Sequence, residues 1–319
     1  MRQYIIRRSL LVIPTVFIIL ALVFMAIRLA PGDIVEIMLA EGAQSAGARV
    51  QTAEHLRKQF GLDKPIHEQF VIYLWSVVRG DLGKSPYDSL PVLDKLINRL
   101  PVTLELAFLA LTTSLLVSIP VGIIAAIRQD TFLDHAVRIL SISSLSAPIF
   151  WTGTMVLIFP AIWWRYFPPL PFERPWEDPV KNLMQMAPPA FILGLALGGS
   201  VARMVRNSLL EVLRQDYVRT AWAKGLRERV VIFRHTLKNA LIPVVTLMGL
   251  QLENLLGGTV IAETIFTIPG IGRLTLRAVE QRDYAQLQAN IIFLALIVLI
   301  VNIIVDISYA WIDPRVRYK

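Results

Sequence analysis

The feature that most constrains this chain is a series of apolar stretches, each long enough to cross a lipid bilayer. In the first, Leu10 to Ile27, only Pro14 and Thr15 among 18 residues are not apolar. A helix of about 20 apolar residues crosses the hydrocarbon core, whereas the apolar part of a cleavable signal peptide is shorter. This stretch therefore predicts a retained transmembrane helix.

Six such stretches predict an all-α, polytopic membrane protein. Charged residues make up 18% of the chain, below the value of about 25% that is typical of soluble domains. The chain has no cysteine, so disulfides and thiolate metal sites are excluded. The expected transmembrane helices cover residues 9–29, 102–127, 137–163, 186–206, 240–262 and 289–311.

The distribution of Lys and Arg predicts the orientation of these helices. The terminal segments and the loops on their side carry 17 Lys and Arg in 62 residues, against 14 in 118 on the other side. Because cytoplasmic loops are enriched in these residues, both termini are expected in the cytoplasm. The same bias accounts for the net charge of +8 without nucleic acid, since no aromatic-basic stripe accompanies it.

These assignments divide the chain into four regions. Residues 1–30 form an N-terminal transmembrane helix, and residues 31–100 form a long outer loop with short amphipathic helices. One of these is expected over Thr52 to Phe60, and another begins at Pro65. A core of five helices follows over residues 101–312, and residues 313–319 are a cytoplasmic tail.

Two motifs resemble catalytic signatures but lack an essential residue. The segment GDLGKS has Val78 where a nucleotide-binding loop requires glycine, and HEQFV has Val71 where a zinc protease requires its second histidine. We therefore expect no catalytic residue, no metal and no cofactor in this chain.

Glu253 is the polar residue that stands out within the fifth apolar stretch, between Gln251 and Asn254. A carboxylate inside a membrane is costly unless it is paired or faces water. Two interpretations stay open: these three residues line a translocation pathway, or Glu253 pairs with a neighbouring helix.

Between the fourth and fifth stretches lies a polar, Arg-rich segment, residues 216–240, that predicts a helical hairpin. Tyr217, Ala221 and Gly225 share one small face of its first helix. Lys224 suits the end of that helix, and Gly225 suits the left-handed position that follows it. A second amphipathic helix contains Arg229. The hairpin either docks on a partner protein or rests on anionic lipid.

The spacing of Ala221, Gly225 and Pro243 resembles the EAA loop of binding-protein-dependent ABC importer permeases. Over nearly the whole chain, other motifs resemble the B-type permease subunit of dipeptide and oligopeptide importers. They are RLAPGD, FGLDKP, GDLGKS, RLPVTLELA, NALIPVVT, AETIFTIPGIG and RDY. One departure is that Arg219 and Thr220 replace the Glu and Ala of the general loop motif.

The resemblance implies one half of a heterodimeric pore in a bacterial or archaeal inner membrane. A C-type permease would supply the other half, two ATP-binding subunits would hold ATP and Mg²⁺, and an outer solute-binding protein would deliver cargo. The hairpin would couple ATP hydrolysis to transport. Its expected coupling residues are Tyr217, Arg219, Ala221, Lys224, Gly225 and Arg229.

The expected cargo is a di- or oligopeptide. Importers of this class also carry nickel, glutathione, opines or oligosaccharides, so these stay open as alternatives. An alternative of another class is an ion-coupled secondary transporter, in which Glu253 would carry the proton.

Overall fold

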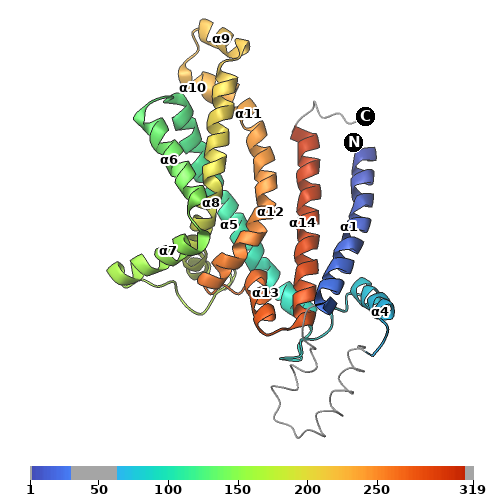
Figure 1. The fold of residues 1–319 in the computed structure, drawn as a ribbon. Helices are drawn as coiled ribbons and strands as arrows, with labels where there is room; N and C mark the ends of the chain where they lie inside the picture. The colour runs from blue at the N-terminus through green and yellow to red at the C-terminus, as the bar shows by residue number, and fades with distance from the viewer. Residues whose placement is uncertain (1, 30–62, 313–319) are drawn as a thin grey trace. The chain divides into compact units, whose positions relative to one another are not determined.

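The structure, a computed structural model, describes residues 2–29 and 63–312 as helices joined by loops, without a β-strand in these ranges (Figure 1). The helix expected over Thr52 to Phe60 and the tail 313–319 lie outside them. The helices of the first half are α1 (Arg2–Leu29), α4 (Ile66–Val78), α5 (Val92–Ile127), α6 (Phe132–Ser146) and α7 (Ile149–Trp164). Those of the second half are α8 (Pro179–Leu213), α9 (Asp216–Ala223), α10 (Glu228–Val230), η1 (Val231–Thr236), α11 (Leu237–Ala240), α12 (Ile242–Ile265), α13 (Ile271–Glu280) and α14 (Tyr284–Ile312).

Three described helices are long and apolar enough to cross a membrane, and they lie within α5, α8 and α14. Two bent pairs, α6 with α7 and the segment Glu228–Ala240 with Ile242–Leu252, raise the number to five if each pair is one span. The apolar part of α1, Leu11–Ala26, is shorter. The multi-helix membrane architecture agrees with the sequence, while the number of six spans stays a prediction.

The continuous helix expected over 137–163 is wrong, because α6 and α7 meet at an angle of 102°. The bend lies at Ala147, whose ψ of 122° is extended. Pro148 follows it, and a residue before proline is sterically driven out of the helical region. Proline also lacks the N–H that would continue the helix.

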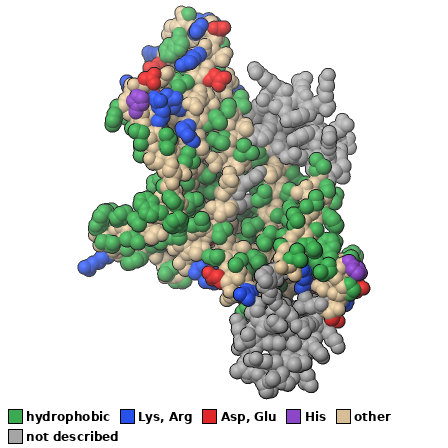
Figure 2. Space-filling view, viewed as in Figure 1, with side chains coloured by type: hydrophobic (Ala, Val, Ile, Leu, Met, Phe, Trp, Pro, Cys, Tyr) green, Lys and Arg blue, Asp and Glu red, His purple; other side chains and the backbone are tan. Residues whose placement is uncertain are grey.

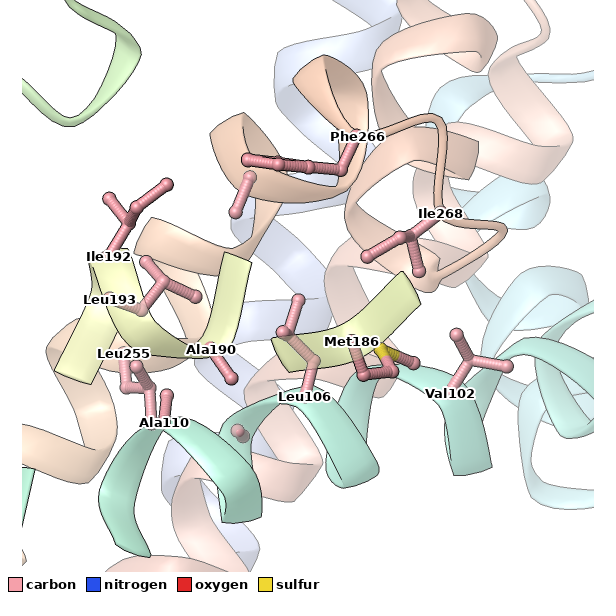
Figure 3. Packing of buried hydrophobic residues seen from close by; sticks show 12 residues of the cluster. Val102, Leu106, Ala110, Met186, Ala190, Ile192, Leu193, Leu255, Phe266 and Ile268 are labelled. Carbon is pink, nitrogen blue, oxygen red and sulfur yellow. The ribbon is translucent and has the colours of Figure 1, made fainter. Parts of the chain in front are cut away.

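The chain divides into two compact units. The first consists mainly of residues 99–273 and is built around α8, which contacts α6, α7, α11 and α12. Figure 3 shows part of its core, where Leu106, Met186 and Leu193 are fully or almost fully buried. The second unit, residues 6–98 and 274–299, contains α1, α4 and the first part of α14.

Glycines allow α8 to approach its neighbours closely. A Cβ on Gly194 would lie 2.8 Å from the carbonyl oxygen of Ala110 in α5, and one on Gly198 would lie 2.7 Å from the Ser118 hydroxyl. Small residues four positions apart on one helix allow such close packing between membrane helices. Gly199 is equally restricted, because its Cβ would collide with Ser144 and the backbone of Ser141 in α6.

Candidate coupling site

Residues 216–240 form the expected hairpin at one end of the first unit. Its first arm is α9, and its second arm runs through α10, η1 and α11. Asp216 lies in the first turn of α9, where a negative charge is favoured by the helix dipole. Two helical arms joined by a short turn form a protrusion that a groove on another protein could receive.

The turn of the hairpin has the hydrogen-bond pattern of a Schellman motif. Gly225 N–H donates to the Trp222 carbonyl at 2.9 Å, and Leu226 N–H donates to the Ala221 carbonyl at 3.4 Å. Gly225 has a φ of +73°, which confirms the left-handed conformation expected at this position. Because glycine has no Cβ, it adopts this conformation without steric strain.

The two arms are held together by a small apolar cluster inside the hairpin. Val218, Ala221 and Val231 are buried against one another, with Leu226 packed beside them. Of the small face expected to receive a partner, Ala221 thus packs inside the hairpin, whereas Tyr217 and Gly225 are exposed. Ala221 therefore shapes the hairpin rather than its outer surface.

Tyr217 joins the same two arms through hydrogen bonds. Its hydroxyl accepts a hydrogen bond from Asn239 Nδ2 at 2.9 Å and donates to the His235 carbonyl oxygen at 3.4 Å. The residue remains 44% exposed. Tyr217 can therefore fix the distance between the arms and still present its ring to a partner.

The outer surface of the hairpin combines cations with large apolar side chains. Arg219, Lys224 and Arg229, expected as coupling residues, are all exposed. Figure 2 shows Lys and Arg together with Asp and Glu gathered at this end, above a long hydrophobic surface. The exposed apolar side chains of the hairpin include Trp222, Val230 and Phe233. This surface suits an acidic groove with an apolar floor.

A π-helical segment, η1, interrupts the second arm. Thr236 is buried, and its hydroxyl donates to the carbonyl oxygen of Val231 at 2.9 Å. Such segments are rare and occur often at functional sites. Its apolar spacing fits an ordinary amphipathic helix, so the sequence alone does not indicate a π-helix here.

The residues of the expected pathway lie in α12, and the structure describes two of their side chains. Gln251 Nε2 donates to Ser200 Oγ of α8, whereas Asn254 is exposed. The side chain of Glu253 is outside the part of the chain that the structure describes. Its role in a pathway or an ion pair stays a prediction.

A buried carboxylate that the sequence analysis missed is Glu263, near the end of α12. It is fully buried and accepts hydrogen bonds from Thr103 Oγ1 at 2.7 Å and from Arg273 N–H at 2.9 Å. Gly270 lies so close that a Cβ there would overlap the carboxylate. Glu263 thus fixes the turn between α12 and α13 against α5.

A second missed carboxylate, Asp134, joins α6 to α8. It is fully buried, and its oxygens accept from Arg206 Nε at 2.6 Å and Arg206 Nη2 at 2.7 Å. Arg138 Nη2 and Asp130 N–H also donate to it. This geometry is the bidentate arrangement that makes Arg–carboxylate pairs strong.

Family models and relatives decide which class of protein this is. Residues 118–318 match the model described as binding-protein-dependent transport system inner membrane component, and residues 1–107 match the model for the N-terminal part of such components. The chain belongs to this family. It is therefore a non-catalytic permease subunit of an ABC importer, and the ion-coupled alternative is wrong.

The relatives span the whole chain. It is 37% identical to the dipeptide transport system permease protein DppB of Escherichia coli strain K12, with 100% of both chains covered. It is 36% identical to the glutathione transport system permease protein GsiC of the same strain, again over 100% of both. These matches agree with the resemblance to peptide importer permeases.

Solved structures show a similar fold. An inward-facing conformation of the MetNI methionine ABC transporter matches with a TM-score of 0.55 and 16% identity, over 69% of this chain and 96% of that one. A second crystal form of MetNI gives a TM-score of 0.54.

Among the described residues, no group of three or more His, Cys, Asp and Glu could hold a metal ion.

Proposed function

We propose that this permease imports short peptides and that its hairpin couples the partner ATP-binding subunits to the pore. The observation that carries the peptide assignment is full-length similarity to one dipeptide and one glutathione permease. Glutathione is itself a tripeptide, so the two relatives share a cargo chemistry: a small molecule with amide groups and charged ends.

The coupling role rests on the geometry of the hairpin. Its arms are joined by buried Val218 and Val231 and by the hydrogen bond between Asn239 and Tyr217, so it moves as one body. A stiff protrusion transmits displacement, whereas a loose loop absorbs it. Exposed Arg219 and Lys224 match an acidic groove on the ATP-binding subunit.

The complete importer would contain a C-type permease, two ATP-binding subunits with ATP and Mg²⁺, and an outer solute-binding protein. Both termini of this chain would lie in the cytoplasm, as the bias in Lys and Arg indicates. Selectivity would be shared with the binding protein. The pore would open alternately to each side by rigid-body movement of the helices.

The test is affinity purification of the tagged full chain from its native membrane, followed by transport in proteoliposomes. We expect an ATP-binding subunit and a second permease to co-purify, and a binding protein to stimulate ATP hydrolysis. Uptake of labelled dialanine and labelled glutathione is then compared. If neither peptide is taken up, the proposed peptide cargo is contradicted. If no ATP-binding subunit co-purifies, the coupling role is contradicted.

A further inference from the structure

A cavity of 340 Å³ lies in the second unit, between the C-terminal end of α1, the helix α4 and the beginning of α14. One part of its wall is apolar, with Phe24, Ile72 and Ile292 among the lining residues. Another part is polar and contains Arg28 and Asp81. A site with this division suits an amphipathic ligand.

The depth of the cavity in the membrane follows from α1. The 18 residues of the apolar stretch Leu10 to Ile27 extend about 27 Å along a helix axis, close to the hydrocarbon thickness of about 30 Å. Arg28 follows this stretch directly. This residue therefore lies where the hydrocarbon ends and the headgroups begin.

The helix α4 lies beside the C-terminal end of α1 (Figure 1), and it has two apolar faces. One packs on α1, with the rings of Phe24 and Tyr73 5.5 Å apart. On the other, Val71, Trp75 and Val78 are 64%, 57% and 76% exposed at helical spacing. An exposed stripe with tryptophan at its centre is typical of a helix in the membrane interface. The cavity is thus bounded by elements that face lipid.

The two charged residues that line the cavity, Arg28 and Asp81, form no ion pair with each other. Among the described residues, Arg28 lies within 4.0 Å of no carboxylate; its guanidinium lies 5.5 Å from the Phe24 ring centroid. Asp81 Oδ1 accepts a hydrogen bond from Gly83 N–H at 3.0 Å. The Oε1 atom of Gln69, another lining residue, is buried without a hydrogen-bond partner in the described structure. Buried acceptors normally have a donor, so a donor is missing here.

We propose that this cavity binds one zwitterionic phospholipid with a primary amine, of the phosphatidylethanolamine class. Arg28 holds the phosphate, and Asp81 and Gln69 accept hydrogen bonds from the ammonium group. One acyl chain lies along Phe24 and Ile292. Burial raises the pKa of Tyr73 to about 12, so the hydroxyl of this lining residue stays a neutral donor near the headgroup.

A peptide is the alternative zwitterion, since its carboxylate and ammonium could meet the same two charges. The lipid is favoured for two reasons. First, the walls come from helices whose outer faces are apolar and exposed. Second, a dipeptide with small side chains would make few contacts with the apolar part of the wall. A lipid acyl chain covers that part and gains the free energy of apolar burial.

The test is native mass spectrometry of the purified complex, titrated with dioleoyl-phosphatidylethanolamine or dioleoyl-phosphatidylglycerol. We expect one tightly held phosphatidylethanolamine for each copy of this chain. Arg28→Gln should weaken its retention about tenfold, as expected for loss of one charge-assisted hydrogen bond. Asp81→Asn should remove the preference over phosphatidylglycerol, because it removes the charge that attracts the ammonium group.

Arg79→Gln is the matched control. Arg79 follows α4 directly and stacks on Trp75 at 4.6 Å, but it does not line the cavity. Its substitution should leave lipid retention unchanged, and elution of each variant as an intact complex shows that it has folded. The proposal is overturned if the wild type retains no lipid or prefers phosphatidylglycerol, if Arg79→Gln weakens binding as much as Arg28→Gln, or if micromolar dialanine displaces the lipid.

Discussion

Replacement of Gly225 by valine separates the backbone geometry of the hairpin from its surface chemistry. An L-residue with a side chain costs about 1–2 kcal/mol in the left-handed region, and up to about 3 kcal/mol when it is strained. A Cβ at Gly225 would meet no atom within 4 Å. The whole penalty of Gly225→Val is therefore backbone strain at the turn, without a clash inside the chain.

A penalty of about 1–3 kcal/mol corresponds to a factor of about 5–150 in the population of the native turn. It acts on the two turn hydrogen bonds, from Gly225 and Leu226, and not on the helices in the membrane. We therefore expect normal amounts of the assembled complex, weak transport, and ATP hydrolysis that no longer rises when the loaded binding protein is added. Faster hydrogen exchange at Leu226 N–H would show the opened turn directly.

Gly225→Asn is the control, because asparagine tolerates the left-handed region better than other residues with a side chain. It should retain most of the coupled activity. Wild-type coupling in Gly225→Val would refute the reasoning, since the turn would then not matter. Equal loss in both variants would also refute it, because the cause would be contact between a side chain and the partner subunit.

Three further variants test the buried ion pair, the buried glutamate and the orientation. Asp134→Leu removes the carboxylate that pairs with Arg206, whose side chain is only 13% exposed, so the solubilised protein should lose about 3–5 kcal/mol of stability in thermal melts, and the added Arg206→Met should restore much of it. Glu263→Ala removes two hydrogen-bond acceptors and should cost about 1–3 kcal/mol; an unchanged melting temperature would argue against its role. In intact cells an impermeant thiol reagent should label Lys84→Cys and spare Asp216→Cys until the membrane is permeabilised. Equal labelling of the two variants in intact cells would contradict the predicted orientation.

Local sequence signals were enough for the hairpin turn. Lys224 and Gly225 specify a helix end within a few residues, because the left-handed position depends only on the backbone there. The close approach of α8 to its neighbours has a similar local signal, the four-residue spacing of Gly194 and Gly198. Features that depend on residues within one helix or turn can thus be predicted from the sequence alone.

Contacts between residues that are far apart in the sequence could not be predicted in this way. Glu263 is satisfied by Thr103, 160 positions earlier in the chain, and Asp134 by Arg206, 72 positions later. The bend between α6 and α7 did have a local signal in Pro148. It was missed because no charged residue interrupts residues 139–164, so a search for long uncharged stretches cannot separate one helix from two.

The tight contact between α6 and α8 limits how permeases of this family can be recombined. Gly199 leaves no room for a side chain beside Ser141 and Ser144, and Asp134 needs its arginine from the other helix. A chimera that takes α6 from a paralogue and keeps this α8 would keep Gly199 and Arg206 but replace the α6 residues that they contact. Functional hybrids between family members are therefore expected only when both helices are exchanged as a single block.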